Sequence, residues 1–171
     1  MLMSHHGTPP RHLLPRNQRL DDGVYCTAGR STFFTLRSSH ARTPFTDPAY
    51  ADIALRCLIE QRAKSCCQVD VYCVMPDHIH LIVTPIKNGV SSLRYVERFK
   101  GRCTYLMRLR GWMGPLWQPR SFDRVLRSDE GLHQAALYIL ENPVRAGLAD
   151  TWQDYRWCGI PQAVTNEECL I

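Results

Sequence analysis

Alternating and clustered apolar positions predict strands and helices in the first half of the chain. The stretch STFFTLR, residues 31–37, is rich in β-branched and aromatic residues and predicts a first strand. Apolar positions at helical spacing then predict a helix over residues 47–64. Two strand-like runs follow, at residues 67–75 and 78–85, and the Pro-Asp pair between them has the chemistry of a turn. These two runs are therefore expected to form an antiparallel β-hairpin.

In the second half, a long apolar stripe predicts a helix over residues 91–110, which stops at a glycine. A tryptophan-bearing loop leads to a short strand over residues 121–127, and a last helix begins near residue 128. An Asn-Pro pair at residues 142–143 interrupts this helix. The first six elements have the βαββαβ order of a split-βαβ fold. We therefore expect an α+β fold with a ferredoxin-like antiparallel sheet and one added C-terminal helix.

Length and polarity predict one domain with two loose ends. The 171 residues suffice for a single core. Residues 1–20 are expected to form a flexible N-terminal segment, residues 21–160 the domain, and residues 161–171 a loose C-terminal tail. No apolar run approaches the roughly 20 residues that cross a bilayer, and the N-terminus lacks an apolar signal-peptide core. We expect a cytoplasmic protein without membrane contact.

Positive charge in this chain is carried mainly by arginine. Of 21 basic residues only three are lysines, namely Lys64, Lys87 and Lys100, and the formal net charge is +5. Guanidinium groups bind phosphate oxygens in pairs and stack on bases, which ammonium groups do not. The composition therefore favours a nucleic-acid partner.

The eight cysteines include no Cys-x-x-Cys pair and no spacing typical of a zinc site. Cys57, Cys73 and Cys103 fall inside apolar patterns, where a free thiol behaves as a small hydrophobic side chain. Reduced, buried thiols are the interpretation that we prefer to a disulfide scaffold.

His78-Ile79-His80 is the sharpest local feature of the sequence. On a strand, alternate residues point to the same side, with their backbones about 6.6 to 6.8 Å apart. By flexing inward, two imidazoles at this spacing can bind one metal ion at roughly 2.1 Å. Ile79, Leu81 and Val83 then face the core on the other side of the sheet. The alternative is a pair of half-exposed histidines that bind nothing.

Three residues near the last helix are candidates for the rest of such a site. Asn142 lies four residues after Tyr138, so on a continuous helix the phenol and the amide share a face, and Arg145 follows three residues later. The alternatives are an N-cap role for Asn142, with Pro143 opening a new helix, and a core position for Tyr138. Six other tyrosines compete for the role of Tyr138.

Longer stretches around these residues resemble a known family. VYCVMPDHIHLIV, residues 71–83, is similar to the histidine-hydrophobic-histidine motif of HUH-type single-strand nucleases. ALYILENPVRAGL, residues 136–148, resembles the tyrosine helix of REP-associated tyrosine transposases. PLWQPRSFDRVLR (115–127) and DYRWCG (154–159) follow the order of the same family. The resemblance covers residues 23–159, which is most of the chain.

This resemblance implies an HUH endonuclease fold and a metal-dependent single-strand DNA endonuclease and strand transferase. In the family pattern, His78, His80 and Asn142 bind the metal, which is expected to be Mg²⁺ or Mn²⁺, and Tyr138 is the nucleophile. The implied product is a 5′-phosphotyrosine beside a free 3′-hydroxyl. The implied partner is single-stranded, hairpin-forming DNA, with repeated extragenic palindromes as the expected substrate. A monomer is expected rather than a dimer.

Two other functions are compatible with parts of this pattern. A domesticated relative that binds palindromic DNA without cleaving it needs the basic surface but not the complete set of site residues. The complete set, His78, His80, Tyr138 and Asn142, is present here, which argues against this alternative. A metal-dependent hydrolase that uses water as its nucleophile is the third interpretation.

DNA contacts are expected at arginines outside the apolar patterns, because neutralising backbone phosphates drives DNA binding. The expected residues are Arg94, Arg98, Arg102, Arg120, Arg124, Arg127 and Arg145. The first three recur every four residues along one helix, opposite its apolar face. Trp112 and Trp117 can stack on unpaired bases. The alternative is a solvated basic face with both tryptophans in the core.

Overall fold

The computed structural model describes residues 21–127 and 129–164. The predicted flexible segment 1–20, a helix start at Ser128 and most of the predicted tail lie outside the described residues. In chain order, the helices and strands are α1 (Asp22–Tyr25), β1 (Thr32–Arg37), η2 (Ser39–Ala41), η3 (Pro44–Thr46), α2 (Pro48–Ser65), β2 (Cys67–Val74), β3 (His78–Pro85), α3 (Ser92–Leu109), β4 (Phe122–Val125), α4 (Asp129–Leu140), α5 (Asn142–Arg145), η4 (Trp152–Asp154) and β5 (Cys158–Gly159).

The strands form one antiparallel sheet with the order β4-β1-β3-β2-β5. The first four strands have the arrangement of a ferredoxin-like sheet, which confirms the predicted fold class. The β2–β3 hairpin is also confirmed. The edge strand β5 was not predicted, since it consists of two residues that pair with Tyr72 and Cys73 of β2.

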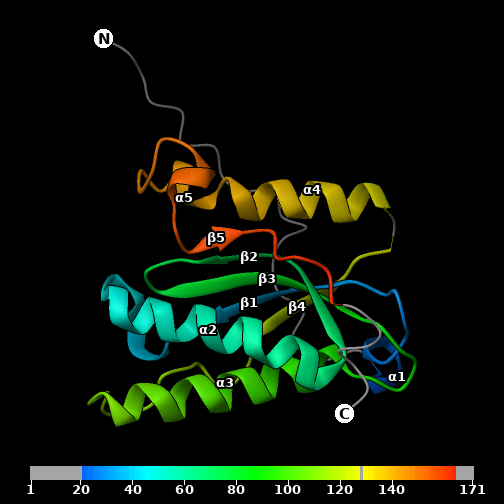
Figure 1. The fold of residues 1–171 in the computed structure, drawn as a ribbon, viewed down its shortest axis with the longest axis horizontal. Coiled ribbons are helices and arrows are strands. Elements are labelled where there is room, and N and C mark those ends of the chain that lie inside the picture. Colours follow the sequence, from blue (N-terminus) through cyan, green and yellow to red (C-terminus); the bar gives the residue numbers. More distant parts are fainter. Residues whose placement is uncertain (1–20, 128, 165–171) are drawn as a thin grey trace.

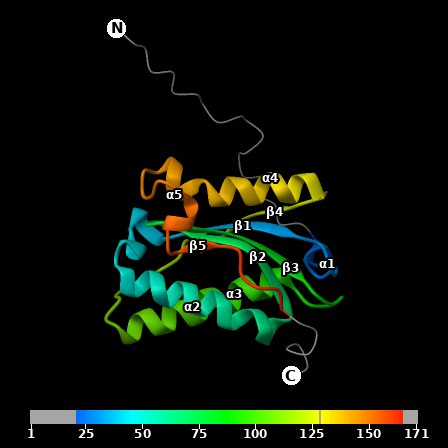
Figure 2. The ribbon, with the colours of Figure 1, turned by 45° about the horizontal axis from the view of Figure 1, so that its top comes forward.

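Helices cover both faces of this sheet and make three layers. Helices α2 and α3 lie side by side on one face, and α4 with α5 lies on the other (Figure 1). The same layers are visible after rotation of the molecule (Figure 2). Helix α4 therefore runs across the sheet face that is opposite to the long helices.

Side chains of β1 and β3 alternate between the two faces. Ile79, Leu81 and Val83 point toward α2 and α3, as predicted. The core on that side also contains Phe34, Leu36, Leu58, Val96 and Phe99. Phe33 and Ile82 point the other way and pack under α4. Since the sheet is covered on both faces, the histidines of β3 lie beneath α4 and not in open solvent.

A β-bulge in β2 adjusts which side chains reach the α4 face. The register with β3 shifts between Val69 and Val71, so that Asp70 is the extra residue. Val69 packs in the core under α2 and α3, whereas Val71 and Cys73 pack under α4. Without this shift, Val69 and Val71 would face the same side of the sheet.

Helix α3 has the predicted apolar stripe, because its buried residues include Leu93, Val96, Phe99 and Cys103. The helix begins after Ser91, whose hydroxyl accepts a hydrogen bond from the Arg94 amide at 3.3 Å. It ends at Leu109, and Gly111 follows shortly after with a φ of +93°. Cys57 and Cys73 are also buried, as expected for small hydrophobic residues. None of the described helices is long and apolar enough to cross a bilayer.

Candidate active site

The start of β3 brings two imidazoles together on the α4 face of the sheet. His78 pairs with Arg37 of β1, and His80 pairs with Thr35. Because both histidines belong to one strand and are two residues apart, they project from the same face. Their Nε2 atoms lie 3.1 Å apart, and their ring centroids are separated by 4.5 Å.

Neighbouring side chains fix the orientation of both rings. The Nδ1 atom of His78 lies 2.6 Å from a carboxylate oxygen of Asp77, and Nδ1 of His80 lies 2.9 Å from the Thr35 hydroxyl. The Nδ1–H group of His78 donates a hydrogen bond to this carboxylate, so the lone pair of the His78 ring lies on Nε2. The Asp77 carbonyl accepts a hydrogen bond from the Ser38 amide at 2.8 Å, so the turn is held to the neighbouring chain segment.

This donor set fits one divalent cation. Two ligand nitrogens at right angles, each about 2.1 Å from an ion, lie about 3 Å apart. The observed Nε2–Nε2 distance of 3.1 Å matches two adjacent corners of an octahedron. Carboxylate support of a metal-binding histidine at its second nitrogen is the usual outer-shell arrangement. No cluster of three or more His, Cys, Asp or Glu residues with such geometry occurs within residues 21–127 and 129–164.

His80 is held in its neutral form. Its side chain is only 6% exposed, and burial lowers the pKa of His80 from its ordinary value of 6.5 to about 3. The neighbouring His78 and the charges of Arg37 and Arg145 act in the same direction. A neutral imidazole is the form that binds metals, so His80 needs no deprotonation near neutral pH.

The lowered pKa of His80 makes the stability of the metal-free protein depend on pH. Below pH 6.5 the unfolded chain protonates His80 but the folded chain does not, until the pH approaches about 3. The unfolded state therefore binds more protons, and the free energy of unfolding falls on acidification by up to about 1.4 kcal/mol per pH unit. We expect His80→Asn to remove this dependence in urea unfolding with a chelator present. The control His133→Asn, at an exposed position, should leave this pH dependence unchanged. If the free energy of unfolding changed equally with pH in both variants, His80 would not be its source.

Helix α4 places the Tyr138 ring beside the histidines. The ring centroid of Tyr138 lies 5.6 Å from that of His80 and 6.2 Å from that of Phe33. The side chain is 41% exposed, so the phenol is accessible from solvent and is not a core aromatic. The phenol and both imidazoles thus come from one chain and lie on one face of the sheet.

Pro143 lies where the last helix is interrupted, one turn after Tyr138. Helix α4 ends at Leu140 and α5 begins at Asn142, which confirms the interruption predicted at the Asn-Pro pair. Pro143 has no N–H to donate to the helix, and the carbonyls of Tyr138 and Ile139 take side-chain donors instead. The Asn142 amide donates to the Tyr138 carbonyl at 2.8 Å and to the Ile139 carbonyl at 3.4 Å.

Asn142 and Arg145 both donate hydrogen bonds at the junction between α4 and α5, which we call the helix corner. Asn142 is the first residue of α5, while Glu141 occupies the N-cap position that was one alternative for Asn142. The Arg145 guanidinium donates to the Tyr138 carbonyl at 2.9 Å and lies 4.3 Å from the centroid of the Tyr138 ring. This contact is a cation–π interaction that holds the ring in place.

Asp77 is expected to strengthen metal binding although it is not itself a proposed ligand. Asp77→Asn removes the carboxylate that supports His78 and should weaken metal binding about 10- to 100-fold, the usual effect of losing such a partner. A Mn²⁺ titration monitored by electron paramagnetic resonance measures this affinity. Asp150→Asn, at an exposed position, is the matched control. Equal affinities for the two variants would show that Asp77 does not support the site.

The predicted DNA-contacting arginines are divided between the two faces of the molecule. Arg94, Arg98 and Arg102 are exposed on α3, which lies on the face opposite to Tyr138. Arg124 pairs with Phe33 and therefore points to the face that carries Tyr138. The remaining residues, Arg120, Arg127 and Arg145, are also exposed. The structure thus brings Arg145 and, on the same face, Arg124 to the side of the histidines.

The two loop tryptophans are partly buried and pack against the hydrophobic core under α2 and α3. The Trp117 ring lies 5.6 Å from Phe45 and 5.9 Å from Phe99, and its Nε1 donates to the Lys100 carbonyl at 3.2 Å. Trp112 packs 5.7 Å from Tyr50. Trp117 is held between hydrophobic neighbours because its loop returns across α3 toward the sheet.

Four neighbours of the site were not predicted. They are Phe33, Thr35, Arg37 and Asp77. The position of Asp77 directly before His78 was a usable signal, since a carboxylate next to a metal-binding histidine often supports it. The other three lie on β1, and only the register between β1 and β3 brings them to the histidines.

Curated relatives share sequence with most of this chain, whereas no family model matches it. A REP-associated tyrosine transposase of Escherichia coli strain K12 is 25% identical over 132 residues, which are 77% of this chain and 76% of the relative. A candidate REP-associated tyrosine transposase of Haemophilus influenzae is 24% identical over 105 residues. That match covers 56% of this chain and 60% of the relative.

Solved structures share the fold. A REP-associated tyrosine transposase bound to a REP hairpin superposes with a TM-score of 0.69 at 20% identity, over 85% of this chain and 82% of the other. A candidate transposase from Deinococcus radiodurans R1 gives a TM-score of 0.51 at 19% identity, over 66% and 91% of the two chains. In sequence and in fold, the chain is a homologue of the REP-associated tyrosine transposases.

Proposed function

We propose that the chain is a metal-dependent single-strand DNA endonuclease and strand transferase that acts on hairpin-forming DNA through Tyr138. The observation that carries this proposal is the meeting of three side chains on one sheet face. The Nε2 atoms of His78 and His80 are 3.1 Å apart, and the Tyr138 ring lies 5.6 Å from the His80 ring. The names of the relatives and the REP hairpin bound by one structural neighbour support a transposase-like, DNA-binding role.

The proposed metal site consists of His78, His80 and Asn142. Because the Asn142 nitrogen donates to backbone carbonyls, its oxygen points away from them and is the atom available to a cation. An amide oxygen, water and phosphate ligands favour Mg²⁺ or Mn²⁺ over zinc. When bound there, such an ion offsets the charge that develops on a non-bridging phosphate oxygen.

The chain's own residues then carry the transfer. Tyr138 Oη loses its proton to solvent and attacks the scissile phosphorus, and the bond from phosphorus to the 3′ oxygen breaks. The 3′ oxygen takes up a proton, and the 5′ side remains linked to Tyr138 as a phosphotyrosine. Arg145 holds the ring, and its charge, with that of Arg37, favours the phosphate. The reverse step rejoins a strand without ATP, since the linkage conserves the phosphodiester bond energy.

We propose repeated extragenic palindromes as the substrate class and a monomer as the active form. Tyr138 and the two histidines belong to the same chain, so a second subunit is not needed to complete the site. Sedimentation of the complex with a DNA hairpin is expected to give one chain per hairpin.

Covalent capture of DNA tests the proposed function. A DNA hairpin with single-stranded arms, labelled on one side of the cut at a time, is incubated with the full chain and Mg²⁺ or Mn²⁺. We expect a protein–DNA adduct on a denaturing gel that carries only the label 3′ to the cut, and no adduct with a chelator. Tight hairpin binding without any adduct would instead indicate the non-cleaving palindrome-binding alternative.

A further inference from the structure

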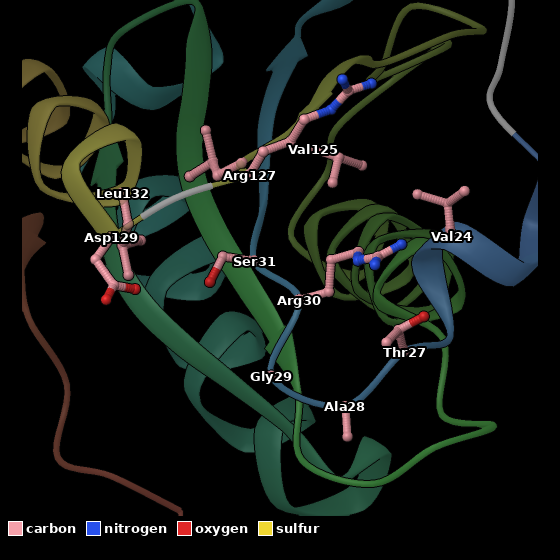
Figure 3. Close-up of a pocket in the computed structure, with 11 residues that line it drawn as sticks. Val24, Thr27, Ala28, Gly29, Arg30, Ser31, Val125, Arg127, Asp129 and Leu132 are labelled. Atoms are coloured by element: carbon pink, nitrogen blue, oxygen red, sulfur yellow. The ribbon is translucent and has the colours of Figure 1, made fainter.

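A second candidate site lies near the start of α4, away from Tyr138. An open pocket of about 700 Å³ is lined by three segments that are distant in the sequence (Figure 3). They are the loop before β1, at residues 27–31, the end of β4 with residues 125–127, and the first turn of α4. This volume is within the range of pockets that hold small organic groups, such as a nucleotide.

Two arginines give this pocket its charge. Arg30 comes from the loop before β1 and Arg127 from the segment after β4. Within the described part of the chain neither guanidinium has an ion-pair or hydrogen-bond partner; the ion pairs found there involve other arginines. In Figure 3 both guanidinium groups extend away from Asp129, the acidic residue of the lining. Two unpaired cations in one pocket are stabilised by an anion. Phosphate suits guanidinium groups, because its oxygens accept two hydrogen bonds from each group.

The pocket wall is fixed by backbone hydrogen bonds before any ligand arrives. The Gly29 amide donates to the Pro85 carbonyl at 2.9 Å, and the Ala28 amide donates to Asn88 at 2.9 Å. The Ser31 carbonyl accepts from the Leu126 amide at 2.9 Å, which ties the loop to β4. Gly29 has a φ of +72°, a conformation that favours glycine. A preformed wall lowers the ordering cost of binding.

Helix α4 links this pocket to the candidate active site. Asp129 begins the helix at the pocket, and Tyr138 is nine residues later, which corresponds to about 14 Å along the axis. Arg124 projects from β4 on the sheet face that α4 covers, because it pairs with Phe33. A single strand that passes Tyr138 therefore reaches the pocket within a few nucleotides.

We propose that this pocket binds a phosphate and its attached base in the DNA strand that is engaged at Tyr138, a few nucleotides from the scissile position. The two guanidinium groups hold the phosphate, and the Asp129 carboxylate is positioned to accept a hydrogen bond from a base. This inference rests on the proposed function, because it assigns a second anchor on the same strand. It gives Arg30, which the sequence left unassigned, a role in DNA binding.

Matched pairs of charge-neutralising variants test the pocket. Arg30→Gln/Arg127→Gln removes both pocket cations, whereas Arg56→Gln/Arg108→Gln removes two exposed cations from α2 and α3 on the opposite face. Binding of a fluorescein-labelled single strand of about 12 nucleotides, randomised in sequence, is followed by anisotropy. We expect the pocket pair to weaken binding at least about tenfold and to reduce the slope against salt by about 1.4. The control pair should change the affinity less than about twofold.

The outcomes separate the pocket from the proposed function. Equal effects of the two pairs, or none, at unchanged unfolding temperature, would overturn the pocket assignment even if the protein cleaves DNA. Weaker binding of the pocket pair alone supports the pocket even if no adduct forms. A deoxynucleoside monophosphate should not displace the strand; displacement by micromolar mononucleotide would overturn the assignment to a DNA strand.

Discussion

Replacing Tyr138 with phenylalanine is expected to eliminate the covalent protein–DNA adduct and, with it, strand cleavage. Phenylalanine keeps the ring that packs near Phe33 and His80 and beneath Arg145, but it lacks the oxygen that attacks phosphorus. Since the ring contacts remain, the unfolding temperature should change little. The adduct is measured on a denaturing gel with a labelled DNA hairpin and Mn²⁺.

A second tyrosine provides the control for this substitution. Tyr105 is 55% exposed on α3, on the opposite face of the sheet, and Tyr105→Phe removes the same atom from a site without histidines. We expect this variant to form the adduct like the unmodified chain. Persistence of the adduct in Tyr138→Phe would refute Tyr138 as the nucleophile. Water-driven cleavage in that variant, without an adduct, would indicate a metal-dependent hydrolase.

Loss of His80 is expected to have the second largest effect. His80→Ala removes one of the two imidazole ligands proposed for the metal. Cleavage should fall at least about a hundredfold, because the metal binds the scissile phosphate and offsets its charge. Adduct yield across a Mn²⁺ titration measures the effect, and excess metal should restore part of the activity. DNA-hairpin binding should persist, since the arginines are unchanged.

His133 offers the matched control for this second substitution. It is exposed on α4, the helix that also carries Tyr138. His133→Ala should leave the Mn²⁺ dependence of the adduct unchanged. Identical Mn²⁺ titrations for His80→Ala and the unmodified chain would exclude His80 as a metal ligand.

The longer elements could be predicted because their periodicity is local. Helix α3 and strands β2 and β3 begin and end within one residue of the predicted bounds, since their apolar positions repeat at 3.6 or 2 residues. Strand β5 has only two residues and exists because β2 offers an edge to pair with. The bulge at Asp70 likewise depends on β3, so no local pattern revealed it.

The candidate site was predictable only as far as single segments reach. Alternation on one strand placed His78 and His80 on a common face, and the geometry agrees. Thr35 lies 45 residues before His80, and only the β1–β3 register brings the two together. The sequence left Asn142 between a ligand and a cap because both uses suit an Asn-Pro pair. The structure adds that the Asn142 nitrogen caps α4, which leaves the oxygen for the proposed ligand role.

Anomalous scattering at the manganese edge is the most direct test of the shared site. Crystals of the Tyr138→Phe chain are grown with Mn²⁺ and a DNA hairpin that has single-stranded arms. We predict a manganese peak about 2.2 Å from Nε2 of both His78 and His80, with a DNA phosphate between this peak and the ring at position 138. A manganese peak at another place, or DNA bound only across α3 on the opposite face, would contradict the account.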